Sequence, residues 1–136
     1  MTLLAAALML SCIARADAAQ VTRIRIKAVG REMAAELDDN AATRALVKRL
    51  PLKLRMLNLY SREMCFNFGE ALPTDNLRGD GYQAGDLIYW PPGRSLVILY
   101  KQDGEKFDRQ QLGHIKSGFE IFNGAGETEV TFEKAE

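Results

Sequence analysis

The side chains best suited to catalysis are scarce in this sequence, and their spacing supports no catalytic centre. His114 is the only histidine, and Cys12 and Cys65 are the only cysteines. A zinc site draws about four ligands from such side chains, so we expect no zinc and no other cofactor within one chain. A general base needs a partner that orients it, and the sequence identifies none for His114. We therefore favour a structural role for this histidine over a catalytic one.

An acidic, glycine-containing stretch between Asp75 and Asp86 has the composition of a calcium loop but not its spacing. Counted from Asp75, the third and fifth ligand positions hold Leu77 and Gly79, which offer no side-chain oxygen. Turn and capping roles explain these residues better than a metal site.

The aromatic residues are the more informative set. They could line a groove for an extended peptide or a small apolar ligand, although packing in a core is the simpler interpretation. Trp90 is the best single candidate, because Pro91 and Pro92 follow it and place it at a strand end, where a barrel would have its rim. The set comprises Tyr60, Phe66, Phe68, Tyr82, Tyr89, Trp90 and Tyr100.

The elements that must position these side chains are mostly strands. Residues 21–28 alternate between apolar and basic side chains, which predicts a half-buried strand, and residues 33–37 continue it as a hairpin. Alternation returns at residues 52–56 and at 129–133. The runs 87–90 and 96–100 are apolar without alternation, which predicts two strands buried on both faces.

Two short helices complete the pattern. Asp38, Asp39 and Asn40 are capping residues before an amphipathic segment, residues 41–50, that ends at Pro51. The capping-box spacing of residues 117–120 predicts a second helix. Many short strands with two helices indicate one small closed or nearly closed β-barrel.

The first residues have a different composition. Residues 1–14 contain no charged side chain, and Ala16 and Ala18 follow with the spacing of a signal-peptidase site. We expect residues 1–19 to be a cleaved signal peptide and residues 20–136 to be a single domain, exported to the periplasm or the exterior. A lipoprotein anchored through Cys12 and a buried N-terminal helix are the alternatives. After cleavage, Cys65 would be the only cysteine, without a disulfide partner.

The net charge of the chain argues against two classes of binding partner. The chain contains 18 basic and 18 acidic residues, so its formal net charge is zero. Nucleic acids and anionic membranes normally select a basic excess, so we expect neither as a partner, and no membrane span in the mature chain.

Several short motifs occur in an order that resembles the small bacterial cyclophilin-like domain proteins. The most specific is Gly85-Asp86-Leu87-Ile88-Tyr89-Trp90-Pro91-Pro92-Gly93, followed by the apolar run 96–100. The others are Asp39-Asn40-Ala41-Ala42, Leu50-Pro51-Leu52, Leu72-Pro73 and residues 112–118. The resemblance extends over residues 21–133 and implies a β-barrel of about eight strands with two helices. It also implies a family without an established general activity.

One segment departs from that family pattern. Residues 61–70 are longer and more aromatic than expected, and we interpret them as a loop in which function could vary. The arginine-centred pattern of true prolyl isomerases aligns with no segment, so no catalytic residue is carried over. The candidate ligand-binding residues are Tyr60, Glu63, Phe66, Tyr89, Trp90 and His114.

Three functional hypotheses follow. We favour a non-enzymatic binding module of cyclophilin-like fold that holds a peptide or small molecule in a groove at the rim. The alternative is a divergent peptidyl-prolyl cis-trans isomerase. A thiol-dependent redox role through Cys65 is the third, although the apolar neighbours Met64 and Phe66 favour a buried, inert thiol.

Overall fold

The computed structural model describes residues 21–135, and the predicted signal peptide lies outside them. Residues 21–135 form eight strands, one α-helix and two 3₁₀ helices. In chain order these are β1 (Thr22–Ala28), β2 (Arg31–Leu37), α1 (Ala41–Lys48), β3 (Leu52–Leu59), β4 (Glu63–Asn67), β5 (Asp86–Trp90), η1 (Pro91–Gly93), β6 (Ser95–Leu99), β7 (Gln110–Ile115), η2 (Phe119–Phe122) and β8 (Thr128–Lys134).

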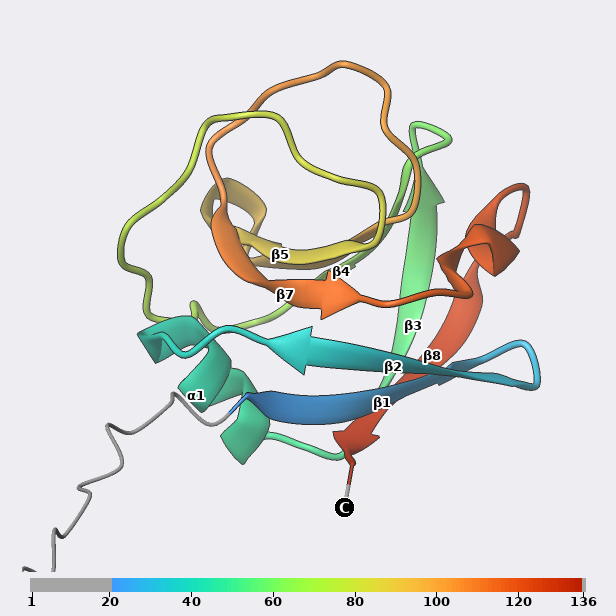
Figure 1. The fold of residues 1–136 in the computed structure, drawn as a ribbon, viewed down its shortest axis with the longest axis horizontal. Coiled ribbons are helices and arrows are strands. Elements are labelled where there is room, and N and C mark those ends of the chain that lie inside the picture. The colour runs from blue at the N-terminus through green and yellow to red at the C-terminus, as the bar shows by residue number, and fades with distance from the viewer. Residues whose placement is uncertain (1–20, 136) are drawn as a thin grey trace, which may run out of the picture.

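The strands close into an antiparallel barrel in the order β1-β2-β7-β5-β6-β4-β3-β8 (Figure 1). The β1–β2 hairpin pairs Thr22 with Leu37 at one end and Ala28 with Arg31 at the other. The mainly β, closed barrel of about eight strands predicted from the sequence is therefore confirmed.

The barrel interior is filled by alternate residues of the strands, as the period of two requires. Ile24 and Ile26 of β1 and Val130 and Phe132 of β8 are fully buried there. Helix α1 adds its apolar face to this core through residues such as Leu46.

The boundaries of α1 follow from its capping residues. The Asn40 side chain accepts a hydrogen bond from the Thr43 amide at 2.9 Å, and the Thr43 hydroxyl accepts one from the Asn40 amide at 3.0 Å. This reciprocal arrangement satisfies two amides that would otherwise lack partners at the helix start.

Three expectations need correction. Residues 63–67, expected to be part of a loop, form β4, a wall strand paired with β3 and β6. Strand β7 was not predicted, because Gln110, Gln111 and Gly113 hide its alternation. The second helix is the short 3₁₀ element η2, whose N-cap is Gly118 with φ of 93° and no side-chain cap from Ser117.

No helix of residues 21–135 is long and apolar enough to cross a membrane.

Candidate functional site

The outer face of three neighbouring strands, β4, β6 and β5, is apolar, and we call it the pocket wall. Met64, Leu96 and Leu87 point into the barrel core, so the residues next to them along each strand point outward. Those outward residues form a second, separate apolar cluster that includes Cys65, Val97 and Ile88. The barrel sheet is thus buried on both faces here.

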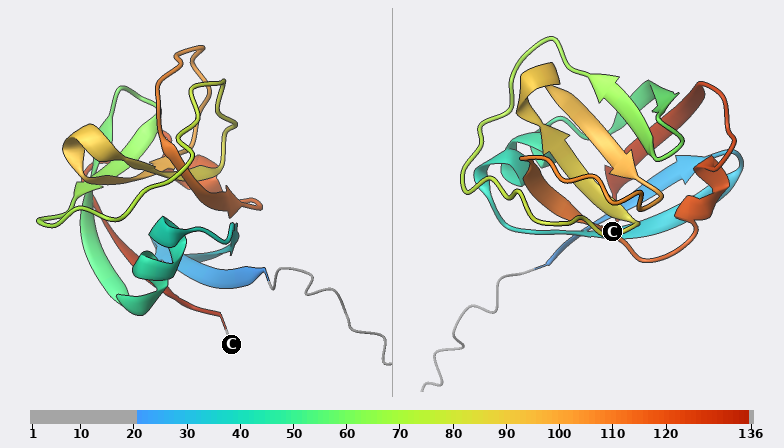
Figure 2. Two further views of the ribbon diagram at one scale, coloured as in Figure 1. Left: turned by 90° about the vertical axis from the view of Figure 1, so that its left-hand side faces the viewer. Right: turned by 90° about the horizontal axis from the view of Figure 1, so that it is seen from above.

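Two long connections cover the pocket wall: residues 68–85, between β4 and β5, and residues 100–109, between β6 and β7. They lie side by side, and Arg78 and Arg109 exchange backbone hydrogen bonds of 2.8 and 2.9 Å (Figures 1 and 2). Tyr82 and Phe107 extend from these connections into the second apolar cluster. The covering segments therefore provide the shielding from water that an outward-facing apolar surface needs.

A pocket of about 350 Å³ remains between the wall and its cover. Strand pairing sets its floor: Cys65 lies opposite Val97, which lies opposite Ile88, and these three form an apolar row. The volume is at the lower end of the range for small-molecule sites.

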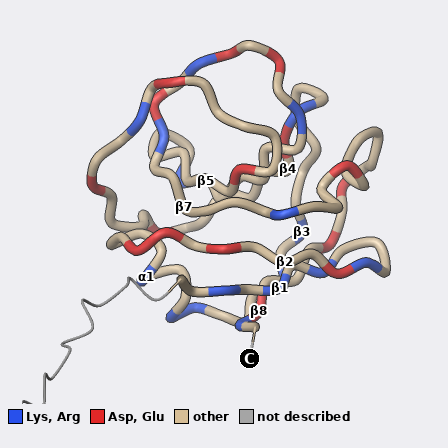
Figure 3. Tube along the Cα trace, viewed as in Figure 1, with Lys and Arg blue, Asp and Glu red and all other residues tan. Residues whose placement is uncertain are grey.

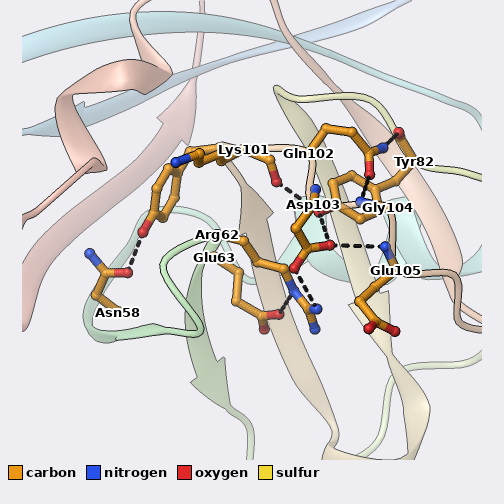
Figure 4. Close-up of polar contacts among 10 residues, drawn as sticks. Asn58, Arg62, Glu63, Tyr82, Lys101, Gln102, Asp103, Gly104 and Glu105 are labelled. Carbon is orange, nitrogen blue, oxygen red and sulfur yellow. Dashed lines mark hydrogen bonds and ion pairs between the residues drawn. The ribbon is translucent and has the colours of Figure 1, made fainter.

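One end of the pocket is charged and centres on Arg62. Its Nε donates to Glu63 Oε1 at 2.9 Å, and its Nη1 donates to Asp103 Oδ2 at 3.1 Å (Figure 4). The guanidinium carbon also lies 4.9 Å from the Tyr60 ring centre and 5.2 Å from that of Phe107. Arg62 thus joins β4 to the covering segment by ion pairs and cation–π contacts.

Asp103 fixes the beginning of this cover. Its Oδ1 accepts a hydrogen bond from the Glu105 amide at 3.0 Å, and its own amide donates to the Tyr82 hydroxyl at 3.2 Å. That hydroxyl in turn donates to the Lys101 carbonyl oxygen at 2.7 Å, and Gln102 bonds to the Tyr82 carbonyl oxygen (Figure 4). Polar contacts therefore hold residues 101–105 to Arg62, at the start of β4, and to Tyr82 of the other covering segment, whereas Phe107 is held by packing.

Glu63 is the most deeply buried carboxylate that lines the pocket, with 7 % of its surface exposed. Burial raises the pKa of this carboxyl group, and the hydrogen bond from Arg62 opposes the shift only in part. Burial likewise raises the pKa of the Cys65 thiol. An unactivated thiol is a poor nucleophile, so Cys65 is not set up for covalent attack.

The opposite end of the pocket is polar and aromatic. Asn67 lies opposite Ser95, which lies opposite Trp90. The Ser95 hydroxyl donates to Asn67 Oδ1 at 2.7 Å, and the Trp90 side chain is partly exposed at the strand end. The pocket thus runs from an ionic end, across an apolar row, to an amide and an indole ring.

A profile of the cyclophilin-like family matches residues 26–133, most of the chain and all of the pocket wall. The chain belongs to the cyclophilin-like family. It is similar to the solution structure of the hypothetical protein AF2241 from Archaeoglobus fulgidus, with a TM-score of 0.66 and 23 % identity, over 85 % of this chain and 95 % of that one. No curated protein matches the chain. The comparisons therefore establish family and fold.

The cyclophilin-like barrel brings together three of the six candidate residues. Tyr60, Glu63 and Trp90 line the pocket, although it extends over the outer wall rather than being confined to the rim. Phe66 and Tyr89 pack on the interior side of the wall.

His114 lies outside the pocket, on the outward side of β7. Its Nδ1 is 2.9 Å from Asp86 Oδ1, and the other oxygen of Asp86 accepts a hydrogen bond from the Gln83 amide at 2.9 Å. The pair therefore holds the loop before β5 against β7.

Other residues of the pocket were not among the sequence candidates. Arg62, Asn67, Ser95 and Phe107 line it, and Cys65, considered only as a thiol, is part of its floor. The period-two alternation of residues 63–67 was the available signal, but it was obscured because both the inward and the outward residues of β4 are largely buried.

The described part of the cyclophilin-like domain contains no group of three histidine, cysteine, aspartate or glutamate side chains that could hold a metal ion.

Proposed function

We propose that this protein is a non-enzymatic binding module whose ligand occupies the pocket on the outer wall of the barrel. The observation that carries the proposal is the pocket itself: an apolar row flanked by fixed polar groups at both ends. Binding sites for small molecules typically combine an apolar lining with a few polar groups that orient the ligand.

The closed sheet bears on the kind of ligand. A common way to hold an extended peptide is to add it as a strand to a free sheet edge. Each of the eight strands between residues 22 and 134 already has two neighbours. Recognition must therefore use side chains, which favours a small molecule over a long extended peptide.

A fluorescent titration tests this proposal. N-phenyl-1-naphthylamine is a neutral aromatic probe, and we expect the full-length protein to bind it with one-to-one stoichiometry. Val97→Phe places a ring into the apolar row and should abolish binding, whereas Thr131→Phe adds the same ring on the outer face of β8 and should not. Thermal unfolding of each variant checks that the barrel is intact.

Two readouts are built into the pocket. Trp90 is the only tryptophan of the chain, so its emission reports on this site alone. In a Cys12→Ser variant Cys65 is the only cysteine, and a bound probe should slow its reaction with a thiol reagent. A folded protein that neither binds the probe nor shows a change at Trp90 or Cys65 would refute the binding module.

Prolyl isomerisation is the alternative function, and one observation makes it worth testing. Arg62, Phe107 and Trp90 share the pocket, although they are distant in sequence. Arg62 is nevertheless paired with two carboxylates, which compete with any substrate carbonyl for its donors. Turnover of a proline-containing test peptide, lost in Arg62→Lys, would replace the binding module with the isomerase.

We also propose that the protein acts outside the cytoplasm, on the basis of the signal-like residues 1–19. Cell fractionation with N-terminal sequencing of the mature protein tests this proposal. A protein that retains Met1 to Ala19 in the cytosol would contradict it.

A further inference from the structure

We propose that the ligand carries a protonated amine joined by a short spacer to a flat apolar group, with the amine bound by Glu63. This assignment rests on the proposed binding function and adds the chemical class of the ligand. It follows from the hydrogen bonding of Glu63, the local charge balance and the spacing of the pocket floor.

The carboxylate of Glu63 has bonding capacity left over. Its Oε1 accepts from Arg62 Nε, whereas no group of residues 21–135 donates a hydrogen bond to Oε2 (Figure 4). Oε2 is not among the fully buried side-chain atoms of residues 21–135 that lack a partner, so this oxygen is accessible to solvent and open to a donor. Glu63 also lines the pocket, so a ligand bound there can donate a hydrogen bond to Oε2 in place of solvent.

The charges around this end favour a cationic donor over a neutral or anionic one. Among the residues that line the pocket, Arg62 and Lys106 supply two positive charges and Glu63 and Glu105 two negative charges, and Asp103, outside the lining, also pairs with Arg62. Arg62 is shared between Glu63 and Asp103 and cannot fully neutralise both. A protonated amine would complete the neutralisation of Glu63 and form a charge-assisted hydrogen bond with it.

The apolar row beyond Glu63 determines the expected length of the spacer and the nature of the group attached to it. Cys65 is two residues further along β4, so the apolar row begins about 7 Å from the Glu63 position. A two-carbon spacer between an amine and an aromatic ring fits that separation. Val97 and Ile88 would contact the faces of the ring, and the partly exposed Trp90 lies beyond them at the open end.

Three probes of the same shape test the assignment. 2-Phenylethylamine, 2-phenylethanol and 3-phenylpropionate share a ring and spacer and differ in their terminal group. Displacement of N-phenyl-1-naphthylamine from the full-length protein gives their affinities at neutral pH. We expect the amine to bind about 10- to 100-fold more tightly than the alcohol, the range of a hydrogen bond to a charged group, and the carboxylate to bind most weakly.

A charge-removing variant locates the contact. Glu63→Gln keeps the shape of the side chain and an acceptor for Arg62, and it should reduce amine affinity to that of the alcohol while leaving alcohol affinity unchanged. Glu70→Gln, at an exposed position whose pairing with Arg49 is long at 3.9 Å, is the matched control and should change neither.

The outcomes separate the two proposals. If the alcohol or the acid binds as tightly as the amine, or if Glu63→Gln leaves the amine preference intact, the amine assignment is overturned and the binding module stands. If none of the probes binds the folded protein, including the naphthylamine, both fail. Should Glu63→Gln not fold, the ranking of the three probes on the unmodified protein still decides.

Discussion

The two outer walls of this barrel enclose one core but present opposite surfaces. The outer face of β3, β8, β1 and β2, which we call the charged wall, carries basic side chains on β3 and β1 and acidic ones on β8 and β2. Figure 3 shows the blue of β1 beside the red of β2. Lys27 Nζ lies 2.8 Å from Glu133 Oε1, and Lys116 Nζ lies 2.9 Å from Glu36 Oε1. The pocket wall instead carries Cys65, Val97 and Ile88 beneath two covering segments.

This difference explains why the pocket lies on one outer face of the barrel and not on the other. The charged wall is exposed to water and carries ion pairs on its surface, so it needs no covering segment. The pocket wall has an apolar outer face that must be covered, and irregular covering loops do not pack as closely as another strand. The pocket is the space that remains between this face and its cover. The ion pair between Arg62 and Asp103 sets how far the covering segment lies from β4.

The most sensitive test of the difference between the two walls is to introduce the same negative charge on each of them and compare the losses of stability. Ile88→Asp would put an unpaired carboxylate on the covered face, and we expect a loss of about 3–5 kcal/mol in the free energy of unfolding. Thr131→Asp places it between Lys27 and Lys53, its neighbours on β1 and β3, and we expect a change within about 1 kcal/mol. Urea denaturation measures both.

Equal losses for Ile88→Asp and Thr131→Asp would show that the two walls do not differ in their tolerance of charge.

A second comparison concerns the cover. Asp103→Ala removes the acceptor for Arg62 and for the Glu105 amide, so we expect faster amide hydrogen exchange in residues 101–108 and weaker binding of the naphthylamine probe. Glu133→Ala removes a carboxylate of similar exposure from the charged wall. It should leave exchange in 101–108 unchanged, and an equal increase from both variants would contradict the proposed role of Asp103.

The pH dependence of stability should have opposite signs on the two walls. Glu63 has a pKa raised by burial, so between 4.5 and its folded-state pKa the native protein holds a proton that the unfolded chain releases. Stability therefore falls as pH rises through that window, and Glu63→Gln should gain stability relative to the parent from about pH 4.5 upward. Arg62 and Asp103, which face the carboxyl group, remain ionised over that range.

Glu133, on the charged wall, should give the opposite pH dependence of stability. The hydrogen bond from Lys27 lowers the pKa of this carboxyl group, so its stabilising effect is present above 4.5 and is lost as pH falls through the lowered value. Glu133→Gln should therefore lose stability relative to the parent as pH rises toward neutrality. Denaturant titrations of the parent and both variants across the acidic range check the two signs, and parallel curves for the two variants would refute the contrast.

The smallest effect is expected for a single pair on the charged wall. Lys53 Nζ lies 3.9 Å from Glu129 Oε1, and both side chains are mostly exposed. Lys53→Met should change the free energy of unfolding by less than about 1 kcal/mol, and added salt should have little effect. A larger loss would mean that this wall depends on its ion pairs individually.

The difference between the two walls also explains which strands could be predicted from the sequence. Strand β1 was predicted correctly because its wall is solvated: Ile24 and Ile26 face the core while Arg25 and Lys27 face water. On the pocket wall that signal is lost, because both faces of β4 are largely buried and Glu63, although polar, is buried as well. Alternation reports on strands only where one face meets solvent.

The site itself depended on information that local patterns do not contain. Trp90 was placed correctly at a strand end by the two prolines that follow it. Tyr89, its neighbour, points into the core, where its hydroxyl accepts a hydrogen bond from the Leu72 amide at 3.1 Å. The meeting of Arg62 with Phe107 required the strand order and the path of the covering segment, which pair residues far apart in the chain.

The most direct test of the central claim is an amide chemical-shift titration of the full-length, isotope-labelled protein with 2-phenylethylamine and, separately, with 2-phenylethanol. We predict saturable shifts confined to β4, β5, β6 and residues 101–109, together with the indole resonance of Trp90. Shifts centred on the charged wall, or none from either compound in the folded protein, would contradict the assignment of the pocket wall as the binding site.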